Sequence, residues 1–123
     1  MFVVLSPTHP DPMYKQVTDQ IKDAIASGDL RPNERLPSVR ELSEALNVSA
    51  ITVKRAYQDL ENDGYVLTRA GLGSFVAAVE RDALRERKLA EVQEELRRLV
   101  RSSAKFGISA GDIVRLARQV KGD

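Results

Sequence analysis

The residues of this 123-residue chain that could do covalent or metal chemistry are few. It contains no cysteine, and its single histidine, His9, lies in a proline-rich segment that would hold a catalytic geometry poorly. A zinc site would need carboxylates alone, and an acyl-transfer triad would depend on this one imidazole. The sequence therefore predicts neither an enzyme nor a resident metal or cofactor.

Residues that could bind a polyanion are more evident, because a Lys54-Arg55 pair follows the small and apolar residues 49–52. Ala50 and Ile51 would form the first turn of a helix, the end that meets base edges when such a helix enters a DNA major groove. The two cations behind them could reach guanine edges or phosphates. At about 100° per residue, Ile51, Arg55 and Gln58 fall opposite the apolar stripe of this helix. An ordinary solvated helix face is the alternative interpretation.

Two short amphipathic helices, separated by about three residues, would position these side chains. Ser38 and Glu41 form a capping box at the start of the first helix, and Asn47 suits its left-handed end. Ser49 caps the second helix almost at once. This spacing is typical of a helix-turn-helix. The apolar stripes consist of Val39, Leu42, Ala45 and Leu46 in the first helix, and of Val53, Ala56, Tyr57 and Leu60 in the second.

A helix before this pair and a hairpin after it complete the expected domain. Asp11 is expected to cap the earlier helix, with Pro12 as its first residue and Gly28 at its end. Residues 65–68 and 74–77 are rich in β-branched and aromatic side chains, and a glycine-containing turn separates them. A helix-turn-helix followed by a hairpin is a winged helix, whose glycine-rich wing tip could approach a sugar-phosphate backbone closely.

The bulk charge of residues 1–79 does not favour nucleic acid, because eight Lys and Arg stand against ten Asp and Glu, a balance of −2. DNA binding must therefore come from a local patch, helped by a second copy of the chain. A protein-protein adaptor that uses a winged helix without DNA stays open as an alternative. The cations of the expected patch are Arg35, Arg40, Lys54, Arg55 and Arg69.

Residues 12–77 resemble the DNA-binding domain of GntR-type bacterial transcription regulators. The resemblance is carried by Met13-Tyr14 with "QVTDQIKDAIASGDLRPNERLPSVRELSEALNVSAITVKRAY", by "LENDGY" and by "AGLGSFV". It implies a phosphate or base contact from the first helix of the pair, base and phosphate contacts from the start of the second, and a wing-tip glycine in the minor groove. The resemblance assigns the contact from the first helix to Arg40 and the minor-groove position to Gly71. In the second helix it assigns base contacts to Ala50, Ile51 and Lys54, and phosphate contacts to Ser49 and Thr52.

Two positions depart from the family pattern. Ala50 stands where Arg or Pro is common, and Ala70 stands where some members have a polar wing residue, so two side chains that could read bases are missing and the resemblance does not imply an operator sequence. Patch and resemblance together predict a set of DNA-binding residues. They are Arg35, Ser38, Arg40, Ser49, Ala50, Ile51, Thr52, Lys54, Arg55, Gln58, Arg69 and Gly71.

Residues 80–123 have a different pattern, a highly charged segment with one apolar stripe at nearly coiled-coil spacing. Gly107 would end that helix, and Ser109 with Asp112 forms a second capping box for a short last helix. Neither helix can bury its apolar face alone, so we expect a helical hairpin that pairs with its twin from a second chain. The predicted dimerisation residues are Leu89, Val92, Leu96, Leu99, Val100, Ile113, Leu116 and Val120.

The expected fold is mainly α with a small β wing: a winged helix-turn-helix in residues 1–79 and a two-helix dimerisation tail in residues 80–123. A tail this short resembles that of the YtrA branch of the GntR family, which implies dimerisation through the tail and, often, repression of operons for ABC-type transporters. The expected mechanism is a homodimeric repressor on a pseudo-palindromic operator.

Double-stranded DNA and a second copy of the chain are the expected partners. The tail cannot enclose a ligand pocket of ordinary size within its own fold, which leaves a pocket at a domain or dimer interface open for a small-molecule effector. No apolar run approaches the ~18 residues of a membrane span, and the first residues lack the basic start of a signal peptide. We therefore expect a cytoplasmic protein.

Overall fold

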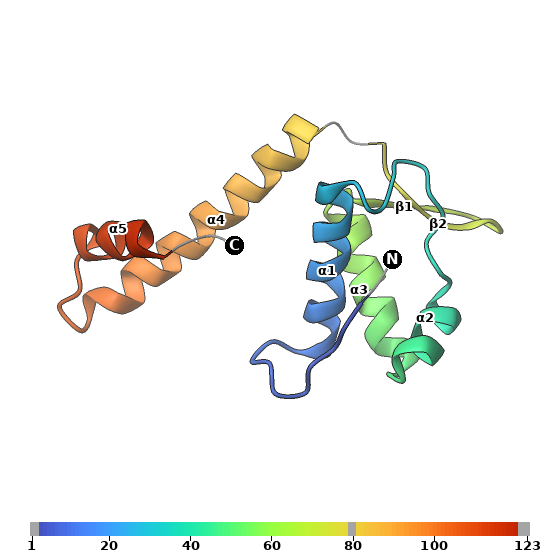
Figure 1. The fold of residues 1–123 in the computed structure, drawn as a ribbon, viewed down its shortest axis with the longest axis horizontal. Coiled ribbons are helices and arrows are strands. Elements are labelled where there is room, and N and C mark those ends of the chain that lie inside the picture. The colour runs from blue at the N-terminus through green and yellow to red at the C-terminus, as the bar shows by residue number, and fades with distance from the viewer. Residues whose placement is uncertain (1–2, 79–80, 121–123) are drawn as a thin grey trace. The chain divides into compact units, whose positions relative to one another are not determined.

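The computed structural model describes residues 3–78 and 81–120, and the chain divides into two compact units, residues 1–81 and 82–123 (Figure 1). The expected domain boundary between residues 79 and 80 lies outside the described residues. The predicted fold class, mainly α with a small two-stranded wing, is confirmed. In chain order the elements are α1 (Met13–Ser27), α2 (Val39–Leu46), α3 (Ala50–Asn62), β1 (Val66–Arg69), β2 (Gly73–Val76), α4 (Arg81–Ala104) and α5 (Ala110–Gln119).

α1 ends as predicted, at Gly28 in the left-handed conformation with φ 90°. Its start differs from the prediction, because Pro12 rather than Asp11 is the N-cap residue and no side chain caps this end. The Asp11 carboxylate lies 3.6 Å from the Lys15 ammonium. That side chain therefore forms an exposed ion pair in place of the predicted cap.

The caps of the helix-turn-helix are confirmed. The Ser38 hydroxyl accepts a hydrogen bond from the Glu41 N–H at 3.0 Å, and the Glu41 carboxylate accepts one from the Ser38 N–H at 3.2 Å. Asn47 ends α2 with φ 55°, and the Ser49 hydroxyl accepts from the Thr52 N–H at 3.2 Å. These local hydrogen bonds set where α2 ends and where α3 begins.

The wing is an antiparallel pair, with Val66 of β1 opposite Val76 of β2. The chain before α2 pairs with the outer side of β2, where the Leu36 N–H donates to the Ser74 carbonyl at 2.8 Å. The pairing is a single antiparallel bridge between Arg35 and Phe75 and not a full strand. This pairing joins the entry to α2 to the base of the wing.

The core of the first unit lies between α1, α3 and the base of the wing, and α2 packs against it mainly through Leu42. Ala45, predicted to belong to the buried stripe of α2, is exposed. The reason is the shortness of α2, whose eight residues bury only Leu42 fully. The most completely buried side chains of this core, at 0–2% exposure, are Val17, Ile21, Leu30, Leu36, Val53, Ala56, Leu60, Val66 and Val76.

The second unit is the predicted helical hairpin, in which α5 turns back beside α4 after Gly107 at φ 74° (Figure 1). Its capping box is confirmed, because the Ser109 hydroxyl accepts from the Asp112 N–H at 3.1 Å while the Asp112 carboxylate accepts from the Ser109 N–H at 2.9 Å. Val120, predicted to lie in the apolar stripe of the last helix, is its C-cap residue instead. Among the tail side chains that the structure describes, only Leu84 is buried.

Candidate nucleic-acid interface

The start of α3 presents small and apolar side chains to solvent. Ile51 is 80% exposed, and Ala50 beside it is exposed as well. The Ser49 and Thr52 hydroxyls hydrogen-bond to each other at 2.8 Å, so both predicted phosphate contacts also serve the cap. The first N–H groups of a helix point outward and favour an anion. This end of α3 is therefore suited to close contact with a nucleic acid.

A buried phenol links α3 to the segment just before α2. The Tyr57 hydroxyl, on the inner side of α3, donates to the Pro37 carbonyl at 2.7 Å, just before α2. Burial raises the pKa of Tyr57 well above its ordinary value, and the nearby Glu41 carboxylate adds to this. The hydroxyl therefore stays protonated and keeps its donor role. The Ser38 backbone N–H, then its side chain, and finally the Arg35 charge lower the pKa of Glu41.

The predicted cations differ in their surroundings. Lys54 is exposed and forms no ion pair within residues 3–78. Arg40 is exposed, and its Nε lies 3.1 Å from the Glu44 carboxylate one turn along α2. Arg55 is held by α1, because its guanidinium lies 3.7 Å from the centre of the Tyr14 ring. Of these three, Lys54 is the one least restrained toward an external partner.

The wing carries the two remaining arginines of the patch. The Arg69 guanidinium lies 4.9 Å from the centre of the Phe75 ring. Arg35 lies over Gly73, so close that a Cβ added there would sit 3.1 Å from its Nε. Gly71 at the tip has φ 75° with open space around it, which leaves the tip narrow. The structure thus divides the predicted residues between the start of α3, the exposed side of α2 and the wing.

Two features of this interface were missed from the sequence. Tyr14 forms the platform for Arg55, and its spacing in α1 indicated only an ordinary core position. Gly73 has φ 114°, a conformation that favours glycine, and the Arg35 side chain lies over it, a contact that the turn pattern did not predict. Residue spacing does not report either contact, because each joins segments that are distant in the chain.

The acidic side chains that give residues 1–79 their negative balance are partly neutralised away from the start of α3. Asp63, just past the end of α3, pairs with Lys22 of α1 at 3.0 Å. Asp19 of α1 pairs with Lys15 at 2.8 Å. The first acid within α3 is Asp59, so its first nine residues carry only Lys54 and Arg55 as charged groups. The positive charge of α3 is therefore concentrated in its first half.

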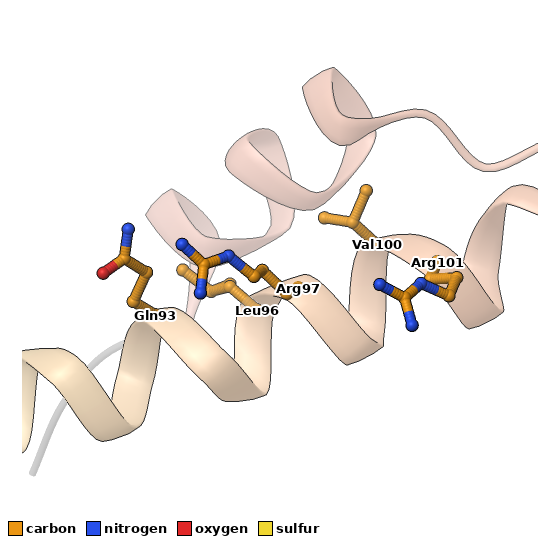
Figure 2. Close-up of a pocket in the computed structure, with 5 residues that line it drawn as sticks. All are labelled: Gln93, Leu96, Arg97, Val100 and Arg101. Atoms are coloured by element: carbon orange, nitrogen blue, oxygen red, sulfur yellow. The ribbon is translucent and has the colours of Figure 1, made fainter.

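The tail carries a surface of a different kind. An open groove of about 420 Å³ runs along α4, lined by Gln93, Leu96, Arg97, Val100 and Arg101 (Figure 2). Leu96 and Val100 are two of the predicted dimerisation residues, and neither is buried within the chain. Among the described residues, no group of three His, Asp or Glu side chains is placed to hold a metal ion, and no helix has the length and apolarity to cross a membrane.

Residues 13–76 match the family model described as "Bacterial regulatory proteins, gntR family". The chain belongs to the GntR family. The HTH-type transcriptional repressor YtrA of Bacillus subtilis is 27% identical over 98% of this chain and 93% of that protein. The likeness covers the tail as well as the winged helix, and the predicted resemblance to the YtrA branch is confirmed.

Two solved structures extend the comparison of this GntR chain. YtrA from Sulfolobus acidocaldarius, a GntR-family transcription factor, matches with a TM-score of 0.61 at 33% identity, over 74% of this chain and 97% of that one. The DNA-binding domain of AraR, in complex with the operator ORX1, matches with a TM-score of 0.55 at 32% identity, over 60% and 92%. The prediction of a DNA-binding transcription regulator is confirmed, and the adaptor without DNA binding is not supported.

Proposed function

We propose that this GntR-family regulator is a homodimeric repressor that binds a pseudo-palindromic operator. Each α3 would lie in a major groove, about one helical turn (~34 Å) from its partner. The observation that carries this proposal is the start of α3, where Ile51 is exposed in the capped first turn and Lys54 is exposed just after it. Bound operator would exclude the polymerase, and such a protein would act in the cytoplasm.

Sequence reading is assigned to Lys54 and Ile51. An ammonium at this position can donate to guanine O6 or N7, and an exposed apolar side chain can contact the thymine methyl group. Ala50 leaves room for the backbone to approach. Gln58, one turn beyond Lys54 on the exposed side of α3, can bond to adenine.

Phosphate contacts are assigned to the remaining residues of the interface. The Ser49–Thr52 hydrogen bond uses one of two hydroxyl hydrogens, which leaves one to donate to a phosphate oxygen. Arg40 would exchange its exposed ion pair with Glu44 for a phosphate. The positioning contacts would come from Arg35, Ser38, Arg40, Ser49, Thr52, Arg55, Arg69 and Gly71.

Dimerisation is assigned to the apolar stripes of the tail. Leu89, Leu96 and Leu99 are each more than 40% exposed in the single chain, which is unfavourable for leucine in water. A second tail laid against them would bury both stripes at once, because a two-fold interface uses the same surface on both chains. The full set is Leu89, Val92, Leu96, Leu99, Val100, Ile113, Leu116 and Val120. The resemblance to the YtrA branch adds a transporter operon as the target.

The test is selection of bound sequences from random duplex DNA with the full chain, followed by titration of the selected site at several salt concentrations. We expect a two-fold symmetric site and a falling log-log salt dependence. Lys54→Ala should weaken binding to the selected site by about 1–3 kcal/mol and random DNA much less. Lys15→Ala, which removes an equal charge from α1, is the matched control and should leave the discrimination unchanged.

Arg69→Ala gives the complementary result. If the wing touches only the backbone, this variant weakens selected and random sequences alike and lowers the salt slope by about 1 for each phosphate that is no longer bound. Equal losses on both kinds of DNA for Lys54→Ala would remove Lys54 from base reading. Failure to enrich any sequence with the unaltered protein would overturn the proposed repressor mechanism.

A further inference from the structure

The positive charge of the protein is concentrated at the far end of the tail, not in the winged helix. Residues 96–120 hold six Lys and Arg against the single acid Asp112, a balance of +5. Residues 1–95 hold twelve Lys and Arg against sixteen Asp and Glu, a balance of −4. The cations of the far end are Arg97, Arg98, Arg101 and Lys105 on and just after α4, with Arg115 and Arg118 on α5.

The four cations at the end of α4 form a row on one side of the helix. At about 100° per residue, Arg97, Arg98 and Arg101 of α4 fall within an arc of about 100°. Lys105 follows one residue after the end of α4, and on a continued helix the row would be about 12 Å long. All four side chains are exposed. We call these four residues the distal row.

The carboxylates within reach of the distal row are few. Arg97 pairs with Glu94, and the other three form no ion pair within the described part of the tail. Cations nearer the start of α4 are placed differently, since Arg85 lies 3.8 Å from Glu86 and Lys88 lies 3.6 Å from Glu91. The distal row therefore holds net charge that its own helix does not neutralise.

Dimerisation would leave Arg98 and Lys105 in solvent, because they lie away from the apolar stripe that a second chain would cover. Arg97 and Arg101 line the groove beside Leu96 and would lie at the edge of that interface. A dimer would thus present two distal rows, one from each chain. Like charges held this closely repel one another, so the row favours an anionic partner that neutralises several of them together.

We propose that the distal row is a second DNA-binding surface, which contacts the phosphate backbone without reading sequence. Three of its four members are arginine, whose planar fork matches phosphate oxygens. Its length corresponds to about three or four phosphates of one strand at ~3.4 Å each along the axis. Leu99 and Val100 stand between its arginines in the sequence, but on the helix they belong to the apolar stripe and not to the row. Phe106 is 83% exposed next to Lys105, so a lipid surface is the rival partner that the experiment includes. This surface acts independently of operator reading by α3.

The experiment compares two full-length double variants on a random-sequence duplex. Arg98→Gln with Arg101→Gln removes two charges from the distal row, and Arg85→Gln with Lys88→Gln removes two charges from the paired part of the same helix. We expect the distal variant to bind severalfold more weakly at low salt, with a log-log salt slope shallower by about 0.9 for each phosphate that the row no longer neutralises. The control variant should keep the slope of the unaltered protein.

A variant that keeps the charge tests whether weaker DNA binding comes from a disturbed fold instead of from the lost charges. Arg98→Lys with Arg101→Lys should retain most of the slope, and all variants should keep the same sedimentation behaviour and helix content. Equal slopes for the distal and control variants would overturn the proposal. So would an unchanged DNA slope combined with weaker binding to phosphatidylglycerol–phosphatidylcholine vesicles, which would assign the row to an anionic membrane surface.

The experiment distinguishes failure of the distal-row proposal from failure of the proposed repressor mechanism. If the distal variant selects the same half-sites as the unaltered protein but binds all DNA more weakly, both proposals hold. If no symmetric site is ever selected and the slope difference persists, the repressor mechanism fails and the distal row stands. If a symmetric site is selected and the slopes are equal, the reverse is true.

Discussion

The two units of the molecule begin helices with the same local signal but differ in what those helices bury. The Ser38–Glu41 box opens α2 and the Ser109–Asp112 box opens α5, with the same pair of reciprocal hydrogen bonds. α2 packs into a unit with a closed core, whereas α5 has no buried residue. A cap therefore decides where a helix starts, and burial decides whether the helix is stable in a single chain.

This difference assigns separate sources of stability to the two units. In the first, Val53, Ala56 and Leu60 are fully removed from water by contacts within the chain. In the second, Leu96 and Leu99 stay 43% and 49% exposed, because the described part of the chain does not cover them. The first unit should be stable at any protein concentration, and the tail should be stable only where chains associate.

The largest expected effect lies in the closed core. Leu60→Ala should lower the free energy of unfolding of the first unit by about 2–5 kcal/mol, because the cavity lies among fully buried neighbours. Ile51→Ala, on the same helix but 80% exposed, should change it by no more than about 0.5 kcal/mol. Thermal unfolding followed by circular dichroism measures both. Similar losses for the two variants would show that α3 does not bury one side as described.

The next largest effect is expected in the tail, whose apolar stripe is exposed in the single chain. Leu96→Glu should raise the dimer dissociation constant at least about 100-fold, because each chain loses about 1.5 kcal/mol or more of leucine burial and a two-fold interface counts it twice. Ala90→Glu adds the same charge on the opposite, exposed side of α4 and should leave the dimer intact. Analytical ultracentrifugation measures the constants. A dimer that survives Leu96→Glu would move the interface away from the α4 stripe.

Most of the fold was predictable because its signals are local. The box of Ser38 and Glu41, the αL residue Asn47 and the stripe of α3 each act within one or two turns, and all are present. The prediction of the α1 cap was wrong for a reason that is also local. Asp11 was expected to cap α1, but its carboxylate pairs with Lys15, and propensity alone does not decide between those two partners.

The candidate site was predictable in its outline but not in its internal contacts. The exposed start of α3 follows from the position of its apolar stripe, and Ile51, Arg55 and Gln58, predicted to lie opposite that stripe, are exposed. The stacking of Arg55 on Tyr14 was not predicted. That contact depends on how α1 crosses α3, and a helical wheel of one helix contains no information about a second one.

A smaller effect tests the link between α2 and α3. Tyr57→Phe should lower the free energy of unfolding by about 1 kcal/mol, because the Pro37 carbonyl loses its 2.7 Å donor in a partly buried position. Tyr14→Phe is the matched control, since its ring rather than its hydroxyl supports Arg55. Denaturant unfolding measures both values. A smaller loss for Tyr57→Phe than for Tyr14→Phe would mean that solvent replaces the Tyr57 bond fully.

The smallest effect compares the two capping boxes by pH. Hydrogen bonds from Ser38, its backbone N–H first, lower the pKa of Glu41, and those from Ser109, followed by Arg115, lower the pKa of Asp112. A lowered folded-state pKa gives stability that is present above the ordinary value of about 4 and is lost as the pH falls through the lowered one. The stabilisation should therefore be complete at about pH 6 and fade below about pH 4.

The readout of this last effect is the amide chemical shift of each N-cap residue. The Ser38 and Ser109 N–H signals should both move with midpoints below the ordinary carboxyl pKa. Because α2 is held by a core and α5 is not, acid should reduce hydrogen-exchange protection in α5 before it does so in α2. Ser109→Ala should raise the midpoint of Asp112 without changing that of Glu41. Simultaneous loss of protection in both helices would mean that the two units unfold as one, against the separation that their burial indicates.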